Sequence, residues 1–74
     1  MKNIEAKKFL TDNLQSKGFE DISAYLKDIQ YGDKTQCYVY CVRAKRNVGS
    51  SGTQYIDHEM HVWHDANGWS MAES

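Results

Sequence analysis

Two segments decide the predicted fold: QCYVYCVRAKR at residues 36–46 and TQYIDHEMHVWHD at residues 53–65. Both are rich in β-branched and aromatic residues, which favour strands. The polar stretch NVGSSG at residues 47–52 lies between them and is typical of a loop. The sequence therefore predicts that the two segments form a β-hairpin.

The alternation of residue types indicates a register for this hairpin, in which Arg46 lies opposite Thr53 and Cys41 lies opposite His58. Since successive side chains of a strand point to opposite sides, this register predicts two chemically different faces. The face expected to be buried collects Cys37, Val39, Cys41, Ile56, Met60 and Val62. The face expected to be open collects Tyr38, Tyr40, Val42, Tyr55, Asp57, Glu59, His61, Trp63 and Asp65.

The N-terminal residues predict an amphipathic helix with Asn3 as its N-cap. Gly18 follows the helix in the position that favours a left-handed residue, and Phe19 is expected to fold back on Leu14 in a Schellman motif. The inward stripe of this helix follows a spacing of 3.6 residues per turn. It consists of Ala6, Phe9, Leu10, Asn13, Leu14 and Lys17.

Residues 21–31 fit either a short helix or a strand, and we favour the strand. A turn at Gly32-Asp33 would set Leu26 opposite Val39 and Tyr25 opposite Tyr40, which keeps both face patterns intact. Asn67-Gly68 is the strongest two-residue hairpin signal in the chain. A last strand is therefore expected, with Ala66 opposite Trp69, and it adds Trp69 and Met71 to the buried face.

These elements predict an α+β fold within a single domain of residues 1–74. An N-terminal helix is expected to pack on one face of a three- or four-stranded antiparallel β-meander, which leaves the other face open. The centre of the core is expected to consist of Phe9, Val39, Met60, Val62, Trp69 and Met71. A domain this short has a small core, so association into a homodimer is a reasonable expectation.

Composition limits the class of protein. The 74 residues carry a formal net charge of −1 and are 41% hydrophobic. This balance does not favour a general nucleic-acid binder or a membrane-surface protein. The start of the chain lacks the apolar stretch of a secretion signal, and no run has the length of a membrane span, so we expect a cytoplasmic protein.

Three histidines recur every third position, at His58, His61 and His64. On a helix this spacing can hold a metal, but on a strand His61 points away from the other two. Cys41 and His58 are expected on the buried face, where a cysteine is usually inert. We therefore expect no metal, no cofactor, no catalytic residues and no enzymatic activity.

Three cations, Arg43, Lys45 and Arg46, gather near one end of the hairpin. Together with the aromatic residues they provide an alternative interpretation, a homodimeric protein associated with nucleic acid. The carboxylates of the open face would repel a phosphate backbone, so nucleic acid is the less favoured partner.

The open face favours a protein partner instead. Tyr and Trp side chains supply large contact areas and attract Arg or Lys, and neighbouring carboxylates can pair with the same cations. The predicted partner is therefore a protein with a basic surface, which this small non-enzymatic module would mask. The predicted contact residues are Tyr38, Tyr40, Tyr55, Asp57, Glu59, His61, Trp63 and Asp65.

In general character the chain resembles the small inhibitors that phages and mobile elements encode. The shared features are its size, an expected cytoplasmic single domain and the lack of a catalytic constellation. This resemblance implies an inhibitor directed at a host defence complex that targets nucleic acid.

Overall fold

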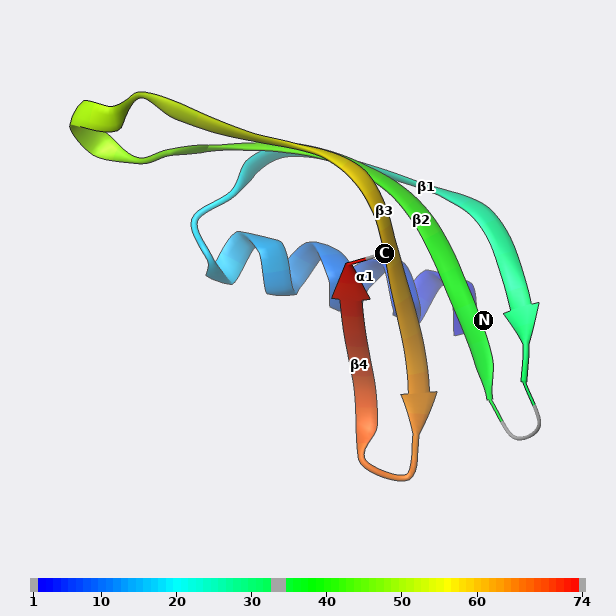
Figure 1. The fold of residues 1–74 in the computed structure, drawn as a ribbon. Helices are drawn as coiled ribbons and strands as arrows, with labels where there is room; N and C mark the ends of the chain where they lie inside the picture. Colours follow the sequence, from blue (N-terminus) through cyan, green and yellow to red (C-terminus); the bar gives the residue numbers. More distant parts are fainter. Residues whose placement is uncertain (1, 33–34, 74) are drawn as a thin grey trace.

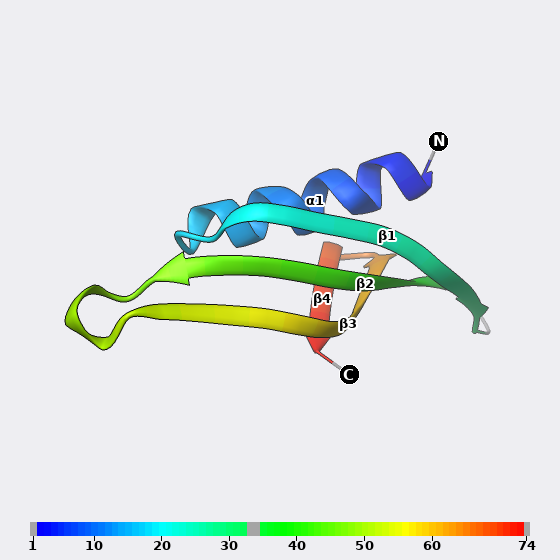
Figure 2. The same cartoon turned by 90° about the horizontal axis from the view of Figure 1, so that it is seen from above.

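The computed structural model describes residues 2–32 and 35–73 of the chain. One antiparallel sheet contains the four strands in the order β1-β2-β3-β4, and helix α1 lies along one of its faces (Figures 1 and 2). The predicted α+β fold is confirmed, with four strands in the meander and a strand at residues 21–31. The elements are α1 (Lys2–Ser16), β1 (Glu20–Tyr31), β2 (Gln36–Asn47), the 3₁₀ turn η1 (Gly49–Ser51), β3 (Thr53–Asp65) and β4 (Gly68–Glu73).

Helix α1 ends in the predicted Schellman motif. The Phe19 amide donates to the Leu14 carbonyl at 3.1 Å, and the Gly18 amide donates to the Gln15 carbonyl at 3.0 Å. Gly18 has a φ of 91°, which a residue without Cβ adopts at little cost. Two details of the prediction are wrong: Asn3 lies inside the helix, and Lys17 is exposed.

The predicted register between β2 and β3 is wrong by one residue. Thr53 lies opposite Asn47, so Met60 lies opposite Tyr40 and Glu59 lies opposite Cys41. A slip of one residue exchanges the two faces of a strand. The residues of β2 that face the helix are therefore Tyr38, Tyr40, Val42 and Ala44, all of them buried.

The larger side chains of β2 explain this register. A buried tyrosine removes far more apolar surface from water than a cysteine does, provided that its hydroxyl finds a partner. The Tyr40 hydroxyl donates to the Asn3 carbonyl at 2.7 Å, and the Tyr38 hydroxyl donates to Gln36 Oε1 at 2.8 Å. Burying both tyrosines under α1 turns Cys37 and Cys41 to the opposite face.

Strand β1 pairs with β2 through two irregularities, between Glu20 and Ser23 and between Leu26 and Asp28. Because of the second one, Leu26 and Ile29 both contact the core although they lie three residues apart. Leu26 lies opposite Tyr40, not Val39 as predicted. This spacing of three explains why the segment also fits a helical pattern.

The predicted two-residue turn at Gly32-Asp33 does not close the β1–β2 hairpin as expected. Tyr31 lies opposite Gln36, and the Gly32 amide donates to the Thr35 carbonyl at 2.9 Å. Asp33, the other residue of that predicted turn, lies outside the described residues.

The β3–β4 hairpin keeps the predicted faces despite a shift. Trp69 lies opposite His64 and not opposite Ala66, so the register differs from the prediction by two residues. A shift of two preserves the face of every side chain. Trp69 and Met71 therefore pack against the core as predicted, and the Trp69 ring stacks with Phe9 at a centroid distance of 6.3 Å.

The core lies between α1 and the sheet. Of the predicted core centre, Met60 and Val62 are buried there, and Phe9, Trp69 and Met71 are partly buried against them. Val39 is also buried, but the register places it on the opposite side of β2. The buried cluster consists of Ala6, Leu10, Leu14, Phe19, Ala24, Tyr38, Tyr40, Val42, Ala44, Ile56, Met60 and Val62.

Candidate protein-binding surface

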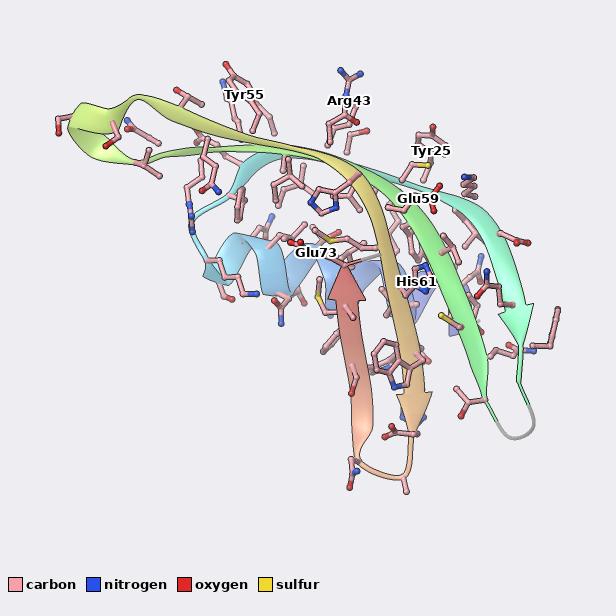
Figure 3. All side chains as sticks on the ribbon, in the orientation of Figure 1. Tyr25, Arg43, Tyr55, Glu59, His61 and Glu73 are labelled. Carbon is pink, nitrogen blue, oxygen red and sulfur yellow. The ribbon has the colours of Figure 1, made fainter. Side chains whose placement is uncertain are left out.

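The side of the sheet that faces away from α1 is the candidate binding surface, and we call it the outer face. The β2–β3 register and the burial pattern assign its residues, and Figure 3 shows Tyr25, Arg43 and Tyr55 projecting from it. No element among the described residues covers this face. It comprises Tyr25, Lys27, Cys37, Val39, Cys41, Arg43, Lys45, Tyr55, Asp57, Glu59, His61, Trp63 and Asp65.

Two tyrosines are the most prominent aromatic groups of the outer face. Tyr25 is 61% exposed and Tyr55 is 75% exposed. Tyr25 lies opposite Cys41, and its hydrogen bond with that side chain raises the pKa of the phenol. Both rings present amphipathic surfaces to solvent, and tyrosine is a side chain that is enriched at protein interfaces.

Ion pairs cross the outer face from strand to strand. Lys27 of β1 pairs with Glu59 of β3 over the intervening strand β2. The hydrogen bond between them raises the pKa of Lys27 and lowers that of Glu59. Since both side chains are substantially exposed, water screens the pair and limits its contribution to stability.

Two further pairs follow the same pattern. Arg43 Nε lies 3.6 Å from Asp57 Oδ2, and Lys45 Nζ lies 3.1 Å from Asp21 Oδ2. The hydrogen bond to Asp21 raises the pKa of Lys45. The outer face thus carries charges of both signs, whereas the sequence pattern predicted an acidic surface.

A shallow depression lies on the outer face where the β2–β3 hairpin extends beyond α1. Its volume is about 320 Å³, and Tyr55 forms one side of it. Charged groups of both signs surround an apolar floor. The lining residues are Asp21, Arg43, Ala44, Lys45, Tyr55, Ile56 and Asp57.

The structure divides the predicted contact residues into two groups. Tyr38 and Tyr40 are only 4% and 2% exposed and lie under the helix, so their predicted place on an open face is wrong. The six residues from β3 share the outer face as predicted: Tyr55, Asp57, Glu59, His61, Trp63 and Asp65.

Sequence reasoning missed the contributions of the neighbouring strands. Tyr25 was expected on the open face opposite Tyr40 and lies on the outer face opposite Cys41, but it was not among the predicted contact residues. Arg43 joins it because of the corrected register. The bulk of the tyrosines in β2 was the available signal, since it favours burying them over the cysteines.

The predicted cluster of three cations is split between the two faces. Arg43 and Lys45 lie on the outer face, whereas Arg46 packs at the C-terminal end of α1. Its guanidinium donates to the Lys17 carbonyl at 3.2 Å and to Gln54 Oε1, and it lies 4.7 Å from the centre of the Phe19 ring. Arg46 therefore connects the helix end to the hairpin.

The histidines alternate between faces as predicted. His61 lies opposite Val39 on the outer face, while His58 and His64 lie on the helix side. His58 Nε2 is 3.7 Å from Glu73 Oε1, and the His64 ring packs edge-on against Trp69.

The predicted pairing of Cys41 with His58 is wrong, because the two side chains lie on opposite faces of the sheet. Cys37, also on the outer face, is half-buried, and this burial raises the pKa of its thiol. Within residues 2–32 and 35–73, no group of three His, Cys, Asp or Glu side chains is placed to hold a metal ion.

No protein-family model matches the chain, and no curated protein or solved structure is significantly similar to it. In the part of the chain that the structure describes, no helix combines the length and the apolar character needed to cross a membrane.

Proposed function

We propose that the protein is a small non-enzymatic binding module that masks a surface of a partner protein with its outer face. The observation that carries this proposal is the outer face of the sheet, which no element of the described residues covers, with its two highly exposed tyrosines, Tyr25 and Tyr55. Tyrosine supplies large contact area at a small cost in side-chain entropy, and exposed rings of this type are common anchors of interfaces.

The charges of the outer face guide the choice of partner. Because Asp57 and Glu59 already pair with Arg43 and Lys27, the face offers both signs of charge. A partner with its own mixture of acidic and basic groups can exchange these exposed pairs for pairs across the interface. This pattern supports a protein partner of mixed charge better than a strongly basic one.

An inhibitor of a host nucleic-acid-targeting complex, encoded by a phage or a mobile element, is a narrower form of this proposal. The open aromatic face supports the masking step that such an inhibitor requires. The split cation cluster gives less support to the alternative of direct nucleic-acid binding, since Arg46 serves the helix end and Arg43 is paired with Asp57.

Affinity purification from the native host tests the proposal with three matched proteins. These are the natural chain, Tyr25→Ala on the outer face, and Tyr31→Ala as the control. Tyr31 is 73% exposed, but its pairing with Gln36 assigns it to the helix side of the sheet. All three should show the same circular dichroism and similar thermal stability.

A protein that co-purifies with the natural chain should be retained by Tyr31→Ala. Its affinity for Tyr25→Ala should fall by about tenfold or more, as expected for an aromatic anchor worth at least ~1.4 kcal/mol. Equal retention by the two variants, or retention by a variant in which both Tyr25 and Tyr55 are alanine, would exclude the outer face as the binding surface.

A further inference from the structure

The edge of β3 is only partly covered. Strand β4 pairs with β3 from Met60 to Asp65, so the segment Thr53–Glu59 has no neighbouring strand on that side among the described residues (Figure 1). We call this segment the β3 edge. Alternate residues of an edge strand direct their backbone N–H and C=O groups outward, where they can pair with another strand.

The opposite edge of the sheet, along β1, carries features that hinder such pairing. Two irregularities interrupt its register, and Asp21, which lies within the first of them, has a φ of 51°. Irregularities of this kind twist an edge away from regular pairing, and charged side chains such as Lys27 and Asp28 discourage it further. Strand β1 is therefore a protected edge.

The β3 edge lacks such irregularities. Residues Thr53 to Trp63 pair with β2 in an unbroken register, so the strand is regular along the whole exposed segment. Both edges carry charged side chains, here Asp57 and Glu59, so the two edges differ in the regularity of their pairing. The difference between the two edges indicates that the β3 edge is available for a further strand.

We propose that the β3 edge pairs with the β3 edge of a second copy of this chain, antiparallel and about a two-fold axis at Tyr55. In a symmetric antiparallel pairing, the outer faces of the two copies lie on the same side of the combined sheet only if the two-fold axis passes through a residue. That residue then lies opposite the same residue of the second copy. Centring on Tyr55 sets Thr53 opposite Asp57 of the second copy, and Gln54 opposite Ile56 of the second copy.

The end of β4 excludes a centre closer to it than Tyr55. Glu73 lies beside Met60, and the loop that contains η1 would reach toward it from the second copy. A centre at Ile56 would advance that loop by two residues, about 6.6 Å, into the space occupied by β4. With the axis at Tyr55, the η1 loop of the second copy lies beside His58 and Glu59, which have no β4 residue next to them.

A second copy suits this edge chemically. No like charges lie directly opposite each other, and the two Tyr55 rings meet on the outer face. On the helix side a groove of about 550 Å³ runs along the edge, and Ile56 of the second copy would lie beside it. Leu14, Phe19, Met60 and Met71 are among the apolar residues that line this groove.

The pairing is expected to be weak. Five residues from each copy form an interface at the low end of the size range for stable complexes, so dissociation in the micromolar range is the reasonable expectation. Association of this kind also suits a small domain, whose own core provides limited stability.

Cysteine cross-linking tests the position of the axis. In a background with Cys37→Ala and Cys41→Ser, Tyr55→Cys places two thiols directly opposite each other at a distance that a disulfide spans. Tyr31→Cys is the matched control, because Tyr31 is 73% exposed and Tyr55 is 75% exposed. Under mild oxidation Tyr55→Cys should form covalent dimers at least about tenfold faster. Equal rates would overturn the proposal.

Sedimentation of the natural chain provides the second measurement. Between about 5 and about 500 µM its mass should rise from one chain toward two. Tyr55→Glu places two carboxylates face to face and should keep the protein monomeric, whereas Tyr31→Glu should not. A natural chain that stays monomeric at every concentration, or a dimer that survives Tyr55→Glu, would overturn the pairing.

Tyr25→Ala separates this inference from the proposed function, because Tyr25 lies on β1, at the opposite edge of the sheet, and not among the residues that would pair between the two copies. It should leave dimerisation intact.

Discussion

Tyr40 and Tyr55 are the same residue type in neighbouring strands, yet one is 2% exposed and the other is 75% exposed. Tyr40 packs under α1 and donates its hydroxyl to the Asn3 carbonyl. Tyr55 projects from the outer face into solvent (Figure 3). Since successive side chains of a strand point to opposite faces, the register between β2 and β3 decides which tyrosine belongs to the core and which to a contact surface.

The largest expected difference between the two faces comes from removing these rings. Tyr40→Ala should reduce the free energy of unfolding by about 3–5 kcal/mol, because it leaves a cavity in the core and removes the hydrogen bond from the Tyr40 hydroxyl to the Asn3 carbonyl. Tyr55→Ala should change it by less than about 0.5 kcal/mol. Urea unfolding followed by circular dichroism measures both. Equal losses would contradict the assignment of faces.

The position of α1 over the inner face depends on the turn that follows it. Gly18→Ala should cost about 1–2 kcal/mol, because the residue has a φ of 91° that a side chain with Cβ adopts only under strain. The cost is one of backbone conformation, since an added Cβ would meet Arg46 Cδ at an ordinary 3.5 Å. Gly18→Asn is the control and should cost less, because asparagine tolerates this conformation better. Thermal unfolding of both variants checks the order.

The hydroxyl groups of the two tyrosines should also differ. Tyr40→Phe leaves the ring in place and removes the hydrogen bond to Asn3, at an expected cost of about 1 kcal/mol. Tyr55→Phe, the matched change on the outer face, should be close to neutral. If Tyr40→Phe were neutral as well, burial of the ring alone would hold the helix in place.

The smallest expected effect concerns the ion pairs of the outer face. Glu59→Gln removes the pair with Lys27 and should lower the free energy of unfolding only slightly at neutral pH. Because folding lowers the pKa of Glu59, its contribution is present above the pKa of the unfolded chain. It is lost as the pH falls through the lowered, folded value.

Unfolding titrations across this pH range should therefore show the natural chain and Glu59→Gln converging in acid. Lys27→Gln should produce the same small loss, and the double variant should lose no more than either single one. A difference that grew in acid would contradict the pairing.

Much of the fold follows from local sequence patterns. The spacing of Leu10 and Leu14 predicts the helix, and Gly18 with Phe19 predicts how it ends. The six contact residues from β3 share a face because they alternate along one strand, whatever strand lies beside them. What local patterns did not predict was the presence of Arg43 beside Asp57, since Arg43 reaches the outer face through the register between β2 and β3.

The sequence by itself determined the order of the elements, the helix stop and the alternation of side chains within each strand, because these depend on residues close together in the chain. Only the tertiary structure decided the register between β2 and β3, and with it which side chains of β2 face the helix. It also decided the irregularity in β1 beside Lys27. Both registers of the hairpin form the same kind of backbone pairing. The choice between them rests on whether cysteines or tyrosines are buried against a helix about 30 residues away in the sequence, at Ala6 to Leu14.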